Sequence, residues 1–585
     1  MKKNKYIFIL FALILASCEN YLEKEPLDKL SDLSVWNDPN TTDAYLTDVY
    51  STVEFKRLGS TNVGFGLIPG MSDELTQFAP WQEPNAAIAT PMNSQTLFPQ
   101  LDYWKYDVIR KINIFINEVT NATDLDENYK STRIAEARWI RAYCYFEMVK
   151  RWGGIPLITE AQNVDDDPET IFVTRNTEQE IYDFVDSELE AIFNDLPNIG
   201  ETEGGRANKW AAKALQSRAN LFAASIARFG TVALDGIVGI PASLENTYWQ
   251  KSYDASKALI ETSPLQLYEK HTDPVINHRQ LFVDEIEDNP EVIFTERYDN
   301  ASGMGQSQAL LAVHADFASG WNSNFRPFLD IVEKFEFNDG TSGEIPRADY
   351  AAQEWDMDDL FNNRDPRFIA AFVYNGAQFW GGTTYFHERS LVNGEWVTSG
   401  ILPDGTLAKA SDRAYEPRPK PLRHGFLIRK FLDESIGVQV GANESDVDFH
   451  IFRLGETYLN MAEAAFYLGK TGEALTLLNR IRQRAGMPDK LTIDEDIIRN
   501  ERAVELVFEE HRFWDLRRWR IAEEVLNGKM MMGLAFEYNH DTGKYKIEVK
   551  NGISNPRVFL PENYYYPLTL GKLSDNPKLV ENPGY

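Results

Sequence analysis

The sequence predicts a mainly α-helical protein in which packed helix pairs form a scaffold and a long, loop-rich insert carries short strands. Three observations support this fold class. Apolar residues recur at helical spacing in residues 133–150 and 207–229. Two further helices, joined by a glycine-containing turn, occupy residues 453–486. From about 286 to 450, short apolar runs alternate with clusters of Gly, Pro, Asn and Asp, which is typical of strands and loops.

The first 34 residues predict an export signal followed by a tether. Three lysines precede the apolar run 6–15, and the sequence LASC ends at Cys18. These are the features of a secretory signal, and the run is too short for a membrane span of about 20 residues. The LASC sequence resembles the lipobox of bacterial lipoproteins. We therefore expect residues 1–17 to be removed, Cys18 to carry lipid, and residues 18–34 to form a polar tether. The alternative is an ordinary signal peptide with a chance cysteine.

The first helical segments each present one apolar face. Steps of three and four residues place these side chains on one side of a helix. The faces comprise Ala135, Trp139, Ala142, Phe146 and Val149 in the first segment, and Leu215, Ala219, Phe222, Ile226 and Phe229 in the second. Gly153 and Gly154 predict the end of the first helix, and Pro156 supports it. Cys144 lies inside this helix, so we expect a buried, small hydrophobic residue.

Residues 453–486 predict a pair of helices. An apolar face containing small residues runs along each half, and Gly469-Lys470-Thr471-Gly472 separates the halves. A pair of about 34 residues with this pattern resembles a tetratricopeptide unit. Because one pair cannot bury its own faces, several pairs must pack together. We therefore expect a helical scaffold over about 35–285 and 450–530, within one domain that spans 35–585.

The loop-rich insert is expected over about 286–450. Strand-like runs occupy 292–295, 368–374 and 426–432, with turn-forming clusters between them. Long loops on a rigid scaffold usually carry function, so this insert is the expected ligand-binding region. Near the end, residues 534–538 and 544–550 flank Asp541-Thr542-Gly543, which predicts a hairpin in a C-terminal region of about 531–585.

Composition and motif spacing argue against nucleic-acid binding and catalysis. The net charge of −30 at pH 7 repels nucleic acid. None of the eight histidines stands in a metal-ligand spacing, and the nucleophile motif G-x-S-x-G does not occur. Nothing in these motifs specifies catalysis, and we expect no cofactor. A surface glycosidase stays a less favoured alternative, because the 89 acidic residues allow many carboxylate pairs and only their separation in space decides.

Four ordered stretches carry a family resemblance. They are 136–143 with 151–157, 452–464 with 478–486, 501–506 with the charged residues up to Trp519, and the closing 576–585. Together they resemble the SusD/RagB family of outer-membrane nutrient-binding lipoproteins from Bacteroidetes, and the LASC sequence fits the same family. Arg502 and Glu505, like Arg512 and Asp515, are three residues apart on a helix. We expect ion pairs within each couple, and a structural role for these motifs.

The resemblance implies a binding protein rather than an enzyme. Family members lie over a TonB-dependent, SusC-like transporter in the outer membrane and help to capture glycans. The implied function is therefore that of a cell-surface lipoprotein that delivers oligosaccharide or polysaccharide to this partner. Peptide capture, as in RagB-like members, is the alternative within the same family.

Candidate ligand residues are aromatic side chains in loops that are rich in Gly or Asn. A sugar presents C–H-rich faces that an aromatic ring can cover, while Asn, Asp and Arg bond its hydroxyl groups. Trp81 and Trp321 fit best, because loops at about these positions supply stacking aromatics in resembling proteins. The other candidates are Asn322, Trp380, Tyr298, Asp73, Arg413 and Tyr415, followed by Trp396, Tyr385 and Arg389.

Overall fold

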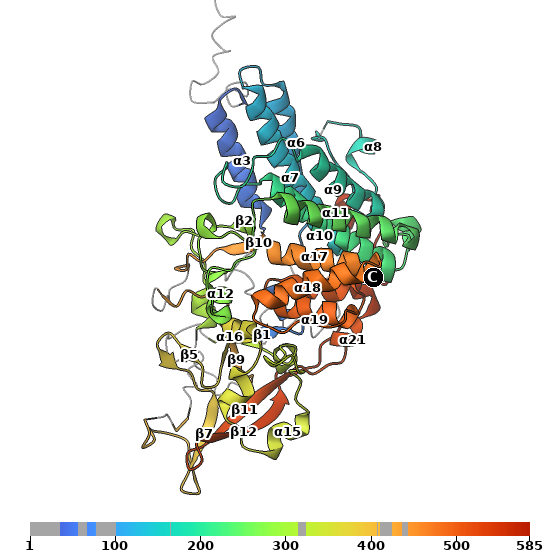
Figure 1. The fold of residues 1–585 in the computed structure, drawn as a ribbon. Coiled ribbons are helices and arrows are strands. Elements are labelled where there is room, and N and C mark those ends of the chain that lie inside the picture. Colours follow the sequence, from blue (N-terminus) through green and yellow to red (C-terminus); the bar gives the residue numbers. More distant parts are fainter. Residues whose placement is uncertain are drawn as a thin grey trace, which may run out of the picture.

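The computed structural model describes residues 36–55, 67–77, 101–163, 165–313, 323–405, 408–409, 424–435 and 443–585. Helices from both ends of the chain form the upper body in Figure 1, and the largest sheet lies at the lower end. Among the helices of these ranges, none combines the length and the apolar character that crossing a membrane requires. The mainly helical fold class is confirmed.

The scaffold combines helices that are distant in sequence. Its N-terminal members are α3 (Pro39–Val53), α6 (Tyr106–Asn121), α7 (Glu127–Trp152), α9 (Glu178–Ile192), α10 (Lys209–Phe229) and α11 (Glu245–Thr262). Its C-terminal members are α17 (Leu454–Tyr467), α18 (Thr471–Arg484), α19 (Glu495–Glu505), α20 (His511–Arg518) and α21 (Ala522–Leu526). Helix α17 packs against α10, α11 and α18, so the N-terminal and C-terminal helices form one packed body (Figure 1).

Helix α7 is buried on more than one side. The Asp126 side chain caps it by accepting the Asn128 N–H at 2.9 Å, and Gly153 (φ +73°) ends it. The predicted apolar face is at most 1% exposed, but Tyr143 and Cys144 are also 0% exposed. Burial raises the pKa of the Cys144 thiol to about 12, which agrees with the expected packing role.

The predicted helix pair 453–486 is present as α17 and α18. Gly469 adopts φ +77° between them, where a side chain would strain the backbone. Ala462 and Leu478 are 0% exposed at the contact between the two helices. Small residues thus allow close packing, as the sequence predicted. The likeness to a tetratricopeptide unit stays a prediction.

Shorter helices connect the larger elements. The α-helices are α4 (Leu67–Gly70), α8 (Pro168–Ile171), α12 (Pro274–Gln280), α13 (Gln308–Ala312), α14 (Leu329–Val332), α15 (Arg347–Ala352), α16 (Pro366–Ala371) and α22 (Leu570–Asp575). The tighter turns are η1 (Leu234–Gly236), η2 (Ala242–Leu244), η3 (Ile286–Asp288), η4 (Asn300–Ser302) and η6 (Pro561–Tyr564), and η5 (Asp358–Asn362) is a π-helix.

The strands form small sheets. They are β1 (Leu75–Gln77), β2 (Val292–Glu296), β3 (Phe325–Pro327), β4 (Phe372–Tyr374), β5 (Gln378–Phe379), β6 (Gly382–Thr383), β7 (His387–Val392), β8 (Glu395–Val397), β9 (Phe426–Ile428), β10 (Phe449–Arg453), β11 (Met532–Asn539) and β12 (Lys544–Asn551). The pairs are β1–β3, β2–β10, β4–β9 and β5–β6, and one sheet has the order β12-β11-β7-β8. The predicted C-terminal hairpin is present as β11–β12, with Phe536 opposite Ile547.

The strand expected over 368–374 is partly wrong. Residues 366–371 form helix α16, and only Phe372–Tyr374 form a strand. Asp365 caps the helix by accepting the Arg367 N–H at 2.9 Å, and Pro366 takes the first helical position. This Asp-Pro start outweighs the apolar, strand-like composition that follows.

The predicted ion pairs within α19 and α20 are also wrong in their partners. Arg502 donates to Asp515, at 3.0 and 3.2 Å, rather than to Glu505. Arg512 donates to Asp73, at 2.8 Å through each of two nitrogens, rather than to Asp515. All five side chains are at most 5% exposed. The motifs are structural, as expected, but they bond across elements instead of along one helix.

Candidate functional site

The described ends of the Trp81 and Trp321 segments meet at one end of the β1–β3 ladder. The strands are antiparallel, and Gln77 stands opposite Phe325. Trp81 follows Gln77 by four residues and Trp321 precedes Phe325 by four, although both tryptophans lie outside the described residues. At a maximum of about 3.5 Å per residue, each is within about 14 Å of this ladder end by chain length alone. We call this ladder end and the backbone beside it the loop-bearing face.

Hydrogen bonds close the base of the segment that contains Trp321. The Ser323 N–H donates to the Val313 carbonyl and the Asn324 N–H to the Leu311 carbonyl, both at 2.8 Å. The Arg326 guanidinium donates to the Ser323 carbonyl at 2.9 Å. Helix α13 and strand β3 therefore hold the two ends of residues 314–322 together. Asn322 lies within that span, outside the described residues.

Tyr298 is positioned by the end of the β2–β10 pair. Its N–H donates to the Asp448 carboxylate at 2.8 Å, and its half-buried ring packs against the main core. Farther along, Gln306 pairs with Ser445 in an antiparallel bridge, and α13 follows at once. One continuous stretch thus leads from Tyr298 to the base of the Trp321 segment.

Asp448 makes the environment of Tyr298 sensitive to pH. Burial raises the pKa of Asp448 to about 7, despite the hydrogen bond from the Tyr298 N–H. A carboxyl whose pKa is raised on folding stabilises the fold below its unfolded pKa of about 4, and that stability is lost as the pH rises through 7.

Replacing Asp448 with asparagine should therefore flatten the decline of Tm between pH 5 and pH 8. The amide keeps an acceptor for the Tyr298 N–H and removes the charge. Thermal unfolding at several pH values measures the slope, with Asp446→Asn as the control because Asp446 is exposed. Some slope will remain, because burial also raises the pKa of Glu74, to about 8. An unchanged slope in the Asp448 variant would contradict this interpretation.

Trp380 lies on a separate hairpin. It follows β5 with φ +45°, and its N–H donates to Glu434 at 3.3 Å. Glu434 in turn accepts hydrogen bonds from Arg429 at 2.6 and 3.0 Å. The half-buried indole lies 4.5 Å from the Phe379 ring and packs on the core. Trp380 is thus held by the body of the protein, apart from the β1–β3 ladder.

Asp73 has its carboxylate engaged inside the scaffold. The residue is 4% exposed, and both oxygens accept hydrogen bonds from Arg512 at 2.8 Å. Burial alone would raise the pKa of Asp73, but the Arg512 guanidinium outweighs it and lowers that pKa to about 2. We therefore correct the expectation of a hydroxyl partner here and assign Asp73 to the scaffold.

Arg413, Tyr415 and the lipidation candidate Cys18 also lie outside the described residues. Of the further choices, Tyr385 is half-buried, with its ring 5.6 Å from His387. Arg389 and Trp396 lie together: the guanidinium carbon is 3.9 Å from the centre of the indole. The sequence analysis missed this pairing, although Asn393-Gly394 is a strong hairpin signal and both residues adopt positive φ.

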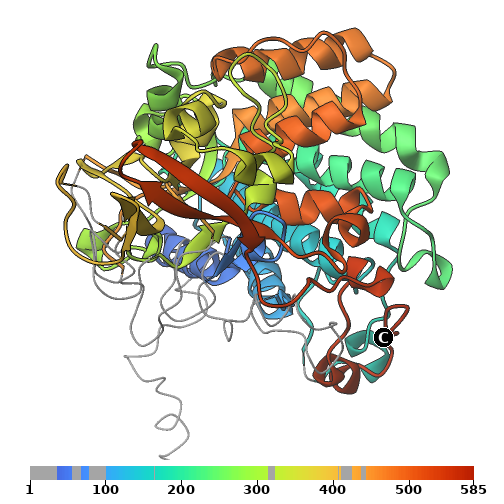
Figure 2. The ribbon, with the colours of Figure 1, turned by 90° about the horizontal axis from the view of Figure 1, so that it is seen from below.

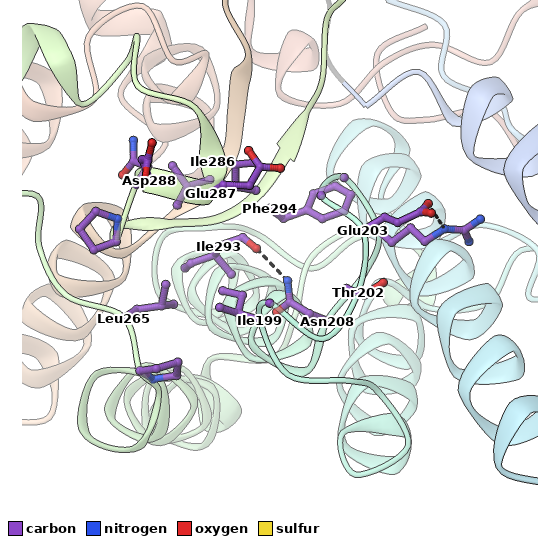
Figure 3. Close-up of a pocket in the computed structure, with 18 of the residues that line it drawn as sticks. Ile199, Thr202, Glu203, Asn208, Leu265, Ile286, Glu287, Asp288, Ile293 and Phe294 are labelled. Atoms are coloured by element: carbon purple, nitrogen blue, oxygen red, sulfur yellow. Dashed lines mark hydrogen bonds and ion pairs between the residues drawn. The ribbon is translucent and has the colours of Figure 1, made fainter.

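A hollow of about 400 Å³ lies between residues 199–208, 264–270 and 286–294 (Figure 3). Ile199, Leu265 and Ile293 form its apolar part, while acidic side chains such as Glu203 stand at its rim. The Asn208 side chain ties one wall to the other by donating to the Ile293 carbonyl at 2.9 Å. Its one aromatic lining residue, Phe294, is 1% exposed and offers no open ring face. The hollow suits an apolar side chain better than a sugar.

In the ranges for which side chains are described, no cluster of three or more His, Cys, Asp or Glu residues could hold a metal ion. Many buried acids and bases there are paired with one another, as Asp73 is with Arg512.

Comparisons with known proteins place the chain among binding proteins. Residues 290–585 match the family described as "SusD family", and residues 20–221 match "Starch-binding associating with outer membrane". A SusD-like protein from Bacteroides fragilis has a similar structure, with a TM-score of 0.73 and 26% identity over 96% of this chain and 100% of that one. A SusD-like carbohydrate-binding protein from the same species has a TM-score of 0.70 and 22% identity over 94% and 100%. The starch-binding protein SusD of Bacteroides thetaiotaomicron is 23% identical over 82% of this chain and 77% of that one.

Proposed function

Because this chain belongs to the SusD family, whose members bind ligands without catalysing reactions, we propose that it captures oligosaccharide or polysaccharide at the cell surface. The observation that carries the proposal is the shared ladder end at Gln77 and Phe325. It brings two tryptophan-containing segments, far apart in sequence, to one place. We propose that the two tryptophans of these segments stack on one run of sugar units.

The surroundings supply further groups for a glycan. Tyr298 stands on the stretch that leads to the Trp321 segment, and its ring is half-buried. Asn322, Arg413 and Tyr415 remain proposed partners for sugar hydroxyl groups or rings. Trp380 remains a proposed ring contact for a glycan, although its hairpin is separate from the β1–β3 ladder.

The same proposal includes an anchor and a partner. We place the lipid on Cys18 and assign residues 18–34 to a tether, which allows the binder to move above the outer membrane. Several acyl chains hold a protein far more firmly than one. The captured glycan would pass to a SusC-like TonB-dependent transporter. The match of residues 20–221 to a family described as associating with the outer membrane supports this location.

Peptide capture is the second candidate, and the hollow in Figure 3 favours it. An apolar centre with charged groups of both signs at the rim suits a peptide that carries an apolar side chain. That hollow lies between scaffold segments and contains no open aromatic face, so it is a poor glycan platform. The two functions therefore use different places on the molecule.

A binding screen against polysaccharides and against peptides decides between glycan capture and peptide capture. Purified protein should be retarded by one or more polysaccharides in affinity electrophoresis and should show no saturable binding to a peptide library. A Glu203→Gln variant serves as the control, because this rim side chain is 87% exposed. Peptide binding that weakens in this variant, together with no retardation by any glycan, would replace the glycan proposal with the peptide one.

A further inference from the structure

One face of the four-stranded sheet carries exposed side chains, among them Lys546 and Trp396. On β11 and β12, Phe536, Tyr545 and Ile547 point to the core and are at most 7% exposed, so the alternate side chains point outward. Glu537 stands opposite Lys546 on that outward side. The sheet lies at the lower end of Figure 1, and Figure 2 shows the β11–β12 hairpin crossing that end of the molecule.

Register extends this outward row across all four strands. Leu391 on β7 pairs with Trp396 on β8 and with Asn539 on β11, so these side chains share a face. Residues two positions away point the same way, which adds Arg389 and Glu537. The row across the sheet is therefore Trp396, Arg389, Glu537 and Lys546.

Trp396 is fixed in this row by direct contacts. The Arg389 guanidinium lies 3.9 Å from the indole centre and donates to one Glu537 oxygen at 2.7 and 2.6 Å. The hairpin turn at Asn393 is itself held, because its N–H donates to Asp541 at 2.9 Å. Even so, Trp396 is 40% exposed. A large aromatic ring is thus held in one orientation and left accessible to solvent.

A polar hollow adjoins the row. It measures about 550 Å³ and is lined by four carboxylates (Glu354, Glu388, Glu537 and Glu548) but only two lysines (Lys546 and Lys550). Glu388 points into it because a bulge in the β7–β11 register lies at this residue. Its Oε1 atom is buried, and no group in the described ranges donates a hydrogen bond to it. A buried acceptor without a donor is costly unless a ligand supplies one.

We propose that this face is a second, independent binding surface for a neutral oligosaccharide. Trp396 covers a sugar ring, and Glu388 accepts a hydroxyl hydrogen bond in the hollow. The excess of carboxylates disfavours sulfated or uronic glycans. A protein partner would require an apolar centre, whereas the row across the sheet joins Trp396 to the charged residues Arg389, Glu537 and Lys546. The ligand class of this surface rests on the proposed function, whereas its location rests on the contacts of Trp396 and Glu388.

Affinity electrophoresis and thermal unfolding of the Trp396→Ala variant test the proposal. Retardation by the polysaccharide that wild-type protein binds should weaken about 2- to 10-fold, the amount that one aromatic contact contributes, while Tm stays unchanged. Glu388→Gln should weaken retardation less, and Trp396→Phe should restore most of it. Leu491→Ala is the control, because Leu491 is 91% exposed on another part of the molecule.

The possible results distinguish the absence of this second surface from a failure of the proposed glycan binding as a whole. Full retardation of both Trp396→Ala and Glu388→Gln would overturn the second surface and leave the loop-bearing face as the binding site. Failure of the wild-type protein to bind any neutral glycan would overturn both. Concentration-dependent dimerisation that Trp396→Ala abolishes would show a second copy as the occupant and would also overturn it.

Discussion

Replacing Glu505 with alanine should lower the free energy of unfolding by about 3–5 kcal/mol, the range for breaking a buried ion pair on one side. Glu505 is 0% exposed and accepts hydrogen bonds from Arg367 at 3.0 Å, from Arg453 at 2.8 Å and from Arg484. Burial alone would raise the pKa of Glu505, but Arg484 and Arg453 outweigh it and hold that pKa well below its ordinary value. Alanine would leave three buried guanidinium groups with fewer counter-charges.

Loss of the Glu505 carboxylate should weaken the contact between the insert and the helical scaffold. Arg367 belongs to the insert, Arg453 ends β10, and Glu505 ends α19, so this carboxylate joins the insert to the scaffold. Chemical denaturation measures the loss, and Glu261→Ala is the matched control, because its pair with Lys257 is exposed and 3.8 Å apart. Surface pairs contribute about 0–1 kcal/mol. A loss below 1 kcal/mol in the Glu505 variant would contradict the structural role of the network.

Replacing Trp81 or Trp321 with alanine should weaken glycan binding by roughly 30-fold each. A stacked indole buries apolar area and adds a ring contact, which together amount to about 2 kcal/mol. Because we propose that these rings serve the ligand, Tm should change little. Calorimetric titration measures the affinity, and Leu491→Ala is again the control. An equal loss of binding and of Tm would show that the residue belongs to the core.

The sequence predicts the helices better than it predicts their partners. The faces of α7 and α10 follow from local periodicity, and burial of Trp139 and Phe222 confirms them. The ion pairs do not follow, because the partner of Arg512 is Asp73, which lies 439 positions away in the chain. Spacing along one helix cannot reveal a carboxylate that the fold brings in from elsewhere. For the same reason, the sequence could not predict that Asp73, in a turn before β1, is buried and paired with Arg512.

The candidate ligand residues show the same limit. Composition selects aromatic residues such as Trp396 and hydroxyl-bonding residues such as Arg389 in polar loops. It does not predict that these two side chains are in contact. Their contact depends on the β7–β8 register, for which Asn393-Gly394 was the available signal. The closeness of the Trp81 and Trp321 segments depends on β1 and β3, short strands that pair across about 250 residues. Three-residue strands carry too little pattern for prediction from sequence.

The central claim is that glycans bind at the loop-bearing face, and a titration of the double variant Trp81→Ala, Trp321→Ala tests it most directly. The polysaccharide that binds wild-type protein should bind the double variant at least about 30-fold more weakly, with only the binding at the Trp396 surface remaining, while the far-UV spectrum and Tm match those of wild-type protein. Binding by the folded double variant with wild-type affinity would contradict the claim.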